Sequence, residues 1–276
     1  MANTAQTSQA DLKKSHQSFL LPVDKENSSL TQLIKTYLPK REIDKVWKAY
    51  RFSEKAHSGQ KRRSGEAYIS HPVSVACIAA RFHLDSQSIQ AALLHDVVED
   101  TESTELEIES KFGKQVRTLV TGLSKLDKVE FQDANEAQAE NFRKMLLAMT
   151  QDVRVMLIKL SDRLHNMQTI QSLDERKKIR IAQETADIYA PIANRLGLNN
   201  LYQELEDLCF EVLHPVRYKT IQKAIKASRG NRKEVIEKIS NEISNKLKSV
   251  KTKAEITGRE KNPASIHRKM LEDQTG

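Results

Sequence analysis

The segment His95-Asp96-Val97-Val98-Glu99-Asp100 constrains the fold more than any other part of this chain. It places side chains that can bind a metal ion or move a proton beside the apolar pairs Leu93-Leu94 and Val97-Val98. In a helix through this segment, His95 lies one turn from Glu99, and Asp96 lies one turn from Asp100. A partly buried carboxylate must be paired, protonated or bound to a cation. The segment therefore predicts a helix that carries a metal site, although a surface helix with a few acids stays open from this motif alone.

The composition favours helices over sheets. The chain has 276 residues with 8 glycines and 6 prolines, and it is rich in Leu, Ile, Ala, Lys and Glu. These residues form helices well, and few glycines and prolines argue against a sheet-rich sandwich or barrel. The length allows one large domain, or one domain and a fragment of another. We expect a mostly helical protein.

Charge and cysteine content narrow the class further. The formal charge of +8 favours anionic partners, such as nucleotides, nucleic acid or an anionic surface. Cys77 and Cys209 are too few and too far apart for a disulfide framework, so we expect buried thiols in a reducing compartment. The sequence shows neither an apolar membrane-spanning stretch nor a secretory signal. These features predict a cytoplasmic protein.

Helix boundaries are marked along the chain. Apolar positions at helical spacing predict a core-facing helix that includes Val46, Ala49, Tyr50 and Ser53, and His71-Pro72 predicts a helix start. Capping boxes are expected at Thr104-x-x-Glu107 and Ser172-x-x-Glu175, and helix ends at Gly113 and Gly197.

A further helix is expected from Val153 to Ile170. Its apolar stripe consists of Val153, Leu157, Leu160, Leu164 and Met167. The same helix carries the polar residues Asp162, Arg163, His165 and Asn166. Asp162 is therefore available to a site that is formed between helices.

Residues from three predicted helices can form one metal centre. The candidate ligands are His71, His95, Asp96 and Asp162. Imidazole and carboxylate ligands without a thiolate suit Mn²⁺ or a similar divalent ion better than a structural zinc. Taken singly, His71 could be a capping or core histidine, and Asp162 could form a salt bridge with Arg163. Their joint occurrence favours the metal site.

This arrangement resembles the HD superfamily of metal-dependent phosphohydrolases, and more closely the hydrolase domain of the RelA/SpoT homologue family. The resemblance spans about residues 30 to 270. It rests on four segments in order: Ala56–Pro72 with its Arg62, Ser64-Gly65-Glu66 and Tyr68, then His95–Thr101, Lys159–Met167 and Tyr189–Gly197. It implies an all-α HD-domain helical bundle.

The resemblance also implies an activity. Members of the family remove the 3′-pyrophosphate from ppGpp and pppGpp, giving GDP or GTP and pyrophosphate with Mn²⁺. By motif position the metal ligands are His71, His95, Asp96 and Asp162. Glu99 and Asp100 would activate or orient the attacking water, and their spacing does not tell which of them is the base.

The resemblance places a nucleotide site beside the metal. Its candidate residues are Arg62, Ser64 and Asn166, with Arg63 and Thr169 as further candidates. Arginine can stack on a base and pair with phosphate oxygens. The basic run Lys61-Arg62-Arg63 could instead be a solvated loop.

Four regions are expected: a flexible tail at 1–28, the hydrolase domain at 29–214, connecting helices at 215–251, and at 252–276 a strand-like fragment that begins a synthetase domain. The motif Gly258-Arg259-x-Lys261 resembles the first basic motif of that domain, which contacts ATP phosphates, but the chain ends before an acidic catalytic motif. We therefore expect no synthesis, and a chain shortened naturally or by design relative to the long form.

Two alternatives to this hydrolase stay open. One is another HD nucleotide phosphohydrolase, against which Glu99-Asp100 and the Arg62–His71 loop argue. The other is a non-catalytic alarmone-binding or regulatory fragment. The resemblance predicts no DNA or membrane partner, and it allows contact with acyl carrier protein or the ribosome in the full-length form.

Overall fold

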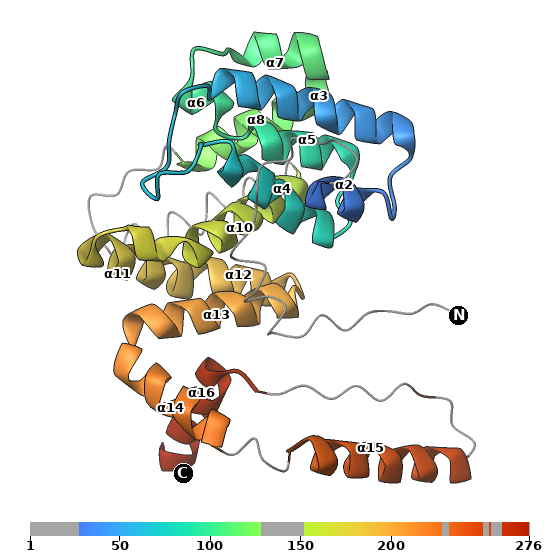
Figure 1. The fold of residues 1–276 in the computed structure, drawn as a ribbon, viewed down its shortest axis with the longest axis vertical. Coiled ribbons are helices and arrows are strands. Elements are labelled where there is room, and N and C mark those ends of the chain that lie inside the picture. The colour runs from blue at the N-terminus through green and yellow to red at the C-terminus, as the bar shows by residue number, and fades with distance from the viewer. Residues whose placement is uncertain (1–27, 128–151, 228–231, 251–253, 255–260, 276) are drawn as a thin grey trace. The chain divides into compact units, whose positions relative to one another are not determined.

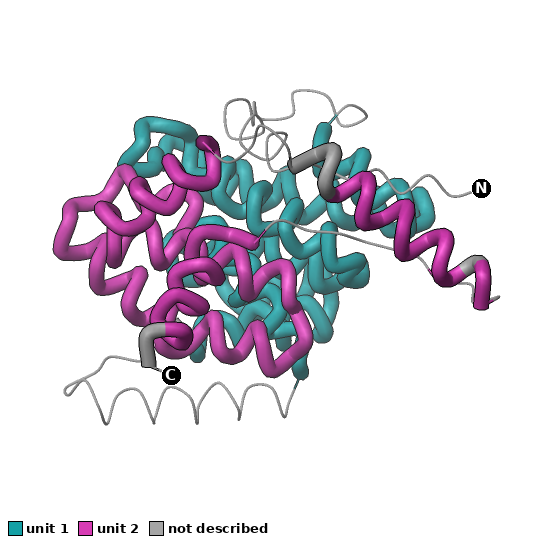
Figure 2. The backbone as a smooth tube through the Cα atoms, turned by 90° about the horizontal axis from the view of Figure 1, so that it is seen from below, with its two compact units in different colours: residues 1–166 teal, residues 167–276 magenta. Residues whose placement is uncertain are grey.

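The computed structural model describes residues 28–127, 152–227, 232–250, 254 and 261–275, and these divide into two compact units, 1–166 and 167–276 (Figure 2). In its described residues, 28–127 and 152–166, the first unit is helical apart from loops and an antiparallel bridge between Lys61 and Ala67. Its helices are α2 (Ser29–Ile34), α3 (Lys40–Ala56), α4 (Ser70–Arg81), α5 (Ser86–Leu94), α6 (Val97–Asp100), α7 (Glu105–Phe112), α8 (Lys114–Asp127) and α10 (Val153–Gln168), of which α10 runs on into the second unit (Figure 1).

The second unit is also helical in its described residues. It contains the 3-10 turn η2 (Ile170–Ser172), α11 (Glu175–Glu184), the π-helical turn η3 (Thr185–Tyr189), α12 (Ala190–Arg195), α13 (Asn199–Leu213), α14 (Pro215–Ala227), α15 (Arg232–Ser249) and α16 (Pro263–Thr275). The expected all-α fold class is confirmed. No described helix has the length and apolar content needed to cross a membrane.

The core of the first unit forms around α5. This helix contacts α3, α4 and α8, and its residues Ile89, Leu93 and Leu94 are fully buried. The predicted core face of α3 is confirmed, since Val46, Ala49, Tyr50 and Ser53 are buried there, as are all residues of α4 from Ser70 to Ala80. Burial of this apolar surface is the main favourable term in folding. It also fixes the ends of α4 and α5, where two candidate ligands lie.

The segment around His95 is not the continuous helix that the spacing predicted. Helix α5 ends at Leu94, and α6 begins only at Val97. In a continuous helix the Ala92 carbonyl would accept the Asp96 backbone N–H. Here it accepts a hydrogen bond from His95 Nδ1 at 2.8 Å instead. A side chain that competes for a helical carbonyl explains the break, and the break turns His95 and Asp96 toward the same side.

The predicted helix ends are right in most places. Helix α4 starts at Ser70, next to His71-Pro72, and the Thr104 side chain accepts a hydrogen bond from Glu107 N at 3.3 Å at the start of α7. Gly113 and Gly197 follow α7 and α12 with φ of 90° and 74°, a backbone conformation that favours glycine.

The capping box at Ser172 is wrong. Ser172 ends the 3-10 turn η2, and the following Leu173 is extended. Asp174 caps α11 instead, because its carboxylate accepts the Lys177 N–H at 2.9 Å. Aspartate is as good an N-cap as serine, and Asp174 lies two residues after Ser172, so residue type alone does not choose between them.

The C-terminal region corrects one expectation. The strand predicted near Ala254–Arg259 lies outside the described residues except for Ala254, and the residues that follow form helix α16. Asp207 of α13 caps α16 by accepting the Ala264 N–H at 3.2 Å, and Ile266 and Ala264 pack against the buried Phe210. The fragment is therefore helical where it is described. The four predicted domain ranges stay a prediction, and residues 1–27 of the expected tail lie outside the described residues.

A close approach between α8 and α10 generates a stability prediction. A Cβ on Gly122 would lie 2.9 Å from Val155 Cγ2. We expect Gly122→Ala to destabilise the protein by about 1–3 kcal/mol through overpacking, despite alanine's better helix propensity. Val155→Ala alone should also cost about 1–2 kcal/mol. In the double variant, the loss of unfolding free energy, measured by urea titration, should be smaller than the sum of the losses in the two single variants. Strictly additive losses would contradict a close contact between residues 122 and 155.

Candidate metal centre

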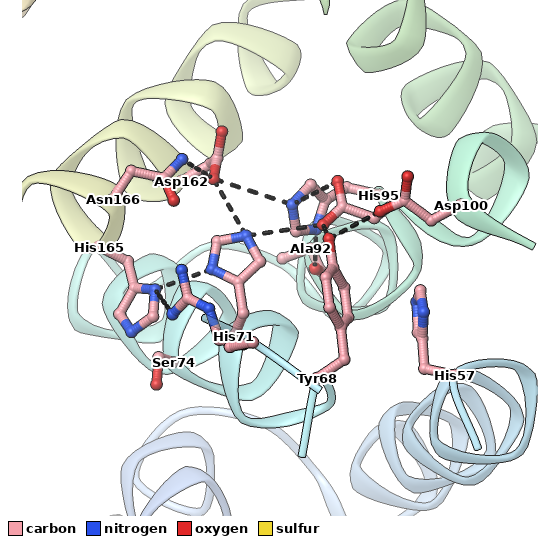
Figure 3. Close-up of polar contacts among 12 residues, drawn as sticks. His57, Tyr68, His71, Ser74, Ala92, His95, Asp100, Asp162, His165 and Asn166 are labelled. Carbon is pink, nitrogen blue, oxygen red and sulfur yellow. Dashed lines mark hydrogen bonds and ion pairs between the residues drawn. The ribbon is translucent and has the colours of Figure 1, made fainter. Parts of the chain in front are cut away.

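The candidate ligands converge in the first unit, although they come from three places in the sequence (Figure 3). His71 lies in the first turn of α4, His95 follows the end of α5, Asp96 precedes α6, and Asp162 lies in α10. His71 Nε2 is 3.2 Å from Asp162 Oδ1 and 3.6 Å from Asp96 Oδ2. His95 Nε2 is 3.0 Å from Asp96 Oδ1 and 3.9 Å from Asp162 Oδ1. The structure thus brings together the four ligands that the sequence predicts.

Both histidine rings direct Nε2 to the centre and use Nδ1 for another contact. His95 Nδ1 donates to the Ala92 carbonyl at 2.8 Å. His71 Nδ1 lies 2.8 Å from His165 Nδ1. His95 Nε2 is fully buried and has no hydrogen-bond partner in the described part of the chain, because its contact with Asp96 is an ion pair without hydrogen-bond geometry. A buried ring nitrogen that has no hydrogen-bond partner is suited to bind a cation.

Asp162 is a buried charge with several partners. Lys159 Nζ lies 3.0 Å from Oδ2, and Asn166 Nδ2 donates to Oδ1 at 2.7 Å. Burial opposes ionisation of this carboxyl group, but Lys159 and His71 outweigh it and hold its pKa well below the usual range. Asp162 is therefore ionised and fixed in direction near neutral pH. Its partner is Lys159, not the neighbouring Arg163 that the sequence offered as the alternative.

The protonation of the two histidines differs in the metal-free protein. Burial opposes protonation of His95, but the Asp96 carboxylate outweighs it and raises the pKa of His95 to about 9. Burial prevails at His71 and lowers its pKa, despite the nearby Asp162 carboxylate. Burial likewise opposes ionisation of Asp96, but the positive charge of His95 lowers its pKa below the usual range. In the metal-free protein, protonated His95 thus supplies the positive charge between the carboxylates of Asp96 and Asp162.

The donor set fits a divalent metal ion. Ligand atoms of His71, His95 and Asp162 all lie within 4.8 Å of one another, and all three residues are buried. Because metal bonds are about 2 Å long, one ion can contact donors up to about 4 Å apart, and His71 Nε2 and His95 Nε2 lie 3.2 Å and 3.9 Å from Asp162 Oδ1. Asp96 contacts both histidines through different oxygens and can supply a fourth ligand. Imidazole and carboxylate donors together suit divalent transition metals.

The acidic pair Glu99 and Asp100 ends helix α6, and both residues are exposed. The Tyr68 hydroxyl lies 2.7 Å from Asp96 Oδ2 and 2.7 Å from Asp100 Oδ2, so it connects a candidate ligand to a candidate base (Figure 3). Burial and the two carboxylates raise the pKa of Tyr68 far above its usual value, so the phenol keeps its hydrogen. The Tyr68 hydroxyl thereby fixes the position of Asp100 relative to the candidate ligand Asp96.

The predicted nucleotide residues are only partly brought together. Asn166 contacts Asp162, and Arg62 Nη1 lies 3.4 Å from His165 Nδ1, so both lie beside the metal centre. Arg63 and Ser64 are exposed in the same loop, which closes through the hydrogen bond from Arg62 N to the Glu66 carbonyl at 2.8 Å. Thr169 follows α10 and belongs to the second unit. The nucleotide roles of these residues stay predictions.

Reasoning from the sequence gave no role to three residues that touch the centre. They are Tyr68, Lys159 and His165. Lys159 and His165 lie three residues from Asp162, within one turn of the same helix, so helical spacing could have singled them out. Tyr68 lies in the loop before α4, where no periodicity indicates the direction of a side chain.

Comparison with known proteins places the chain in a family. The family model described as HD domain matches residues 49–199, and this span contains all four candidate ligands. The chain belongs to the HD domain family. Its resemblance to the RelA/SpoT homologues is also confirmed: it is 54% identical over 243 residues to the bifunctional (p)ppGpp synthase/hydrolase SpoT of Escherichia coli K12. That match covers 88% of this chain and 35% of the relative.

Other relatives agree. The chain is 52% identical over 242 residues to the guanosine-3′,5′-bis(diphosphate) 3′-pyrophosphohydrolase of Vibrio cholerae, a match that covers 88% of this chain and 34% of the relative. The chain spans about a third of the length of the curated relatives it matches. A solved structure of a metazoan orthologue of SpoT, described as hydrolysing ppGpp, superposes with a TM-score of 0.50 at 25% identity, covering 63% of this chain and 96% of the other.

The raised pKa of His95 predicts how the stability of the metal-free protein depends on pH. Because the folded-state value of about 9 lies above the usual value of 6.5, the stabilisation is complete below pH 6.5 and is lost as the pH rises through 9. We expect the free energy of unfolding, measured in chelator by urea titration, to fall by about 1 kcal/mol per unit between pH 7 and 9.

The control is His95→Asn, which cannot take up a proton. Its unfolding free energy should change less with pH over the same range, and groups common to both proteins, such as the buried Cys77 thiol, cancel in the comparison. Equal slopes for the two proteins would show that His95 is not protonated in the metal-free fold.

Proposed function

We propose that this chain is a Mn²⁺-dependent (p)ppGpp 3′-pyrophosphohydrolase, which converts ppGpp or pppGpp to GDP or GTP and pyrophosphate. The observation that carries the proposal is the cluster of His71, His95, Asp96 and Asp162 with Asp100 attached through Tyr68. The names of the relatives support the substrate, since several are guanosine-3′,5′-bis(diphosphate) 3′-pyrophosphohydrolases. Such a protein acts in the cytoplasm.

The four ligand residues would hold the ion, and Asp96 and Asp162 would offset its charge. When bound, Mn²⁺ lowers the pKa of water and neutralises charge on a phosphoryl group. His71 and His95 must be neutral to act as ligands, so the proton on His95 leaves when the ion enters. Uptake of the metal is therefore coupled to proton release.

The chemistry requires one proton acceptor and one proton donor. An oxygen of water forms a bond to the phosphorus that is attached to the ribose 3′ oxygen, and the bond between that phosphorus and the 3′ oxygen breaks. Pyrophosphate leaves, and the 3′ oxygen takes up a proton. Asp100 is the acceptor that we assign to the water proton, because Tyr68 fixes it relative to Asp96. Glu99, exposed one residue earlier, orients the water or the substrate.

The nucleotide would lie over the loop before α4. Arg62 supplies a planar cation for the purine base or a phosphate, with Arg63 and Ser64 beside it. Asn166 contacts Asp162 from one turn further along α10, and Thr169 is a further candidate from the sequence. The acyl carrier protein and the ribosome remain possible partners of a longer form.

The first test is product analysis with ppGpp. The purified chain should release GDP and pyrophosphate when Mn²⁺ is present, and chelator should abolish the release. Asp162→Ala should lower kcat by at least about 1,000-fold, because it removes a candidate metal ligand and the buried carboxylate that pairs with Lys159. Metal-dependent loss of a 5′ phosphate, or no turnover at all, would contradict the proposal; tight ppGpp binding without turnover would indicate a sensor.

The second test separates the two acids. Asp100→Asn should lower kcat by about 100- to 10,000-fold with little change in KM, and it should remove the acidic limb of the pH profile of kcat. Glu99→Gln should retain that limb and lose less activity. Tyr68→Phe, which keeps the ring but not the hydroxyl, should lie between the two. The reverse order for Asp100 and Glu99 would make Glu99 the base.

A further inference from the structure

The two candidate histidine ligands are oriented by different partners. His95 Nδ1 faces the Ala92 carbonyl oxygen, which can only accept a hydrogen bond. The hydrogen of a neutral His95 therefore lies on Nδ1, and the Nε2 lone pair faces the centre. His71 Nδ1 instead faces another ring nitrogen, Nδ1 of His165, at 2.8 Å. Since a neutral imidazole can donate or accept at this atom, the contact permits two arrangements.

Only one arrangement allows His71 to bind a metal. If His165 donates, the hydrogen of His71 lies on Nε2 and points to Asp162 Oδ1, 3.2 Å away, so no lone pair is available to an ion. If His71 donates, its hydrogen lies on Nδ1 and the Nε2 lone pair faces the centre. Metal binding at His71 thus requires an acceptor at His165 Nδ1.

The surroundings of His165 favour the acceptor form. Arg62 Nη1 lies 3.4 Å from the same His165 Nδ1. A guanidinium group carries only donors and a positive charge, so a hydrogen on His165 Nδ1 would point toward another N–H, whereas a lone pair would be attracted to it. His165 is buried, at 8% exposure, which limits competition from water. Of the two contacts that His165 Nδ1 makes, the contact with His71 Nδ1 is shorter, at 2.8 Å, than the contact with Arg62, at 3.4 Å. The lone pair of His165 Nδ1 therefore accepts the hydrogen of His71.

We propose that His165 is a positioning residue that accepts the His71 Nδ1 hydrogen and so directs the His71 Nε2 lone pair to the metal ion. Figure 3 shows His165 behind His71, on the side away from His95. It has the role for His71 that the Ala92 carbonyl has for His95. Partners of this kind fix the tautomer of a ligating histidine, and their loss typically lowers metal affinity about 10- to 100-fold. The proposal rests on the proposed function, because it takes His71 to be a metal ligand.

The test compares two side chains of the same shape. In His165→Asn the amide oxygen is the same number of bonds from Cα as Nδ1 and can accept from His71. In His165→Leu a methyl group occupies that place. The purified chain is stripped of metal with chelator, and its dissociation constant for Mn²⁺ is measured by calorimetry for the wild type and both variants. Thermal unfolding of the metal-free proteins reports any general loss of structure.

We expect His165→Asn to bind Mn²⁺ within about 3-fold of the wild type and His165→Leu to bind about 10- to 100-fold more weakly. A Leu variant that binds as tightly as the wild type, or an Asn variant as weak as the Leu variant, would overturn the proposal. If the wild type binds Mn²⁺ with the expected order among variants but releases no pyrophosphate from ppGpp, the proposed function fails alone. If the wild type does not bind Mn²⁺, both fail.

Discussion

The centre depends on a carboxylate buried inside a helical protein. Asp162 lies on α10 with almost no exposure, and ionising it there would be costly without compensation. Lys159, His71 and Asn166 provide that compensation from two helices. The orientation of α10 against α4 in the first unit is therefore fixed by charge as well as by apolar packing. Removing one partner would leave a buried charge uncompensated, which costs more than the pair contributes.

The break between α5 and α6 is the second requirement. A continuous helix would separate His95 and Asp96 by 100° around its axis, as for any two consecutive residues. Because His95 takes the Ala92 carbonyl, the helix stops, and Asp96 can contact both His95 and His71. The same hydrogen bond sets the hydrogen of His95 on Nδ1. The hydrogen bond between His95 Nδ1 and the Ala92 carbonyl thus ends helix α5 and also directs the His95 Nε2 lone pair to the centre.

The environment of the centre distinguishes roles among similar residues. His95 holds a proton in the absence of metal because Asp96 is adjacent, whereas burial keeps His71 neutral. Asp96 and Asp100 share the Tyr68 hydroxyl, but Asp96 is largely covered and Asp100 is exposed. One carboxylate is therefore suited to hold an ion, and the other to exchange a proton with water or substrate.

The sequence by itself determined the helical class and the core face of α3, and it singled out the four candidate ligands that the structure brings together, because helical periodicity and a rare combination of His and Asp are local signals. It did not determine the break after Leu94 or the cap at Asp174, where nearby residues offer competing hydrogen bonds, or the helix at 263–275, which is capped by the distant Asp207. Only the tertiary structure placed Tyr68 between two carboxylates and His165 behind His71. Those contacts join residues 28 to 94 positions apart, and no local pattern in the chain encodes how distant side chains meet.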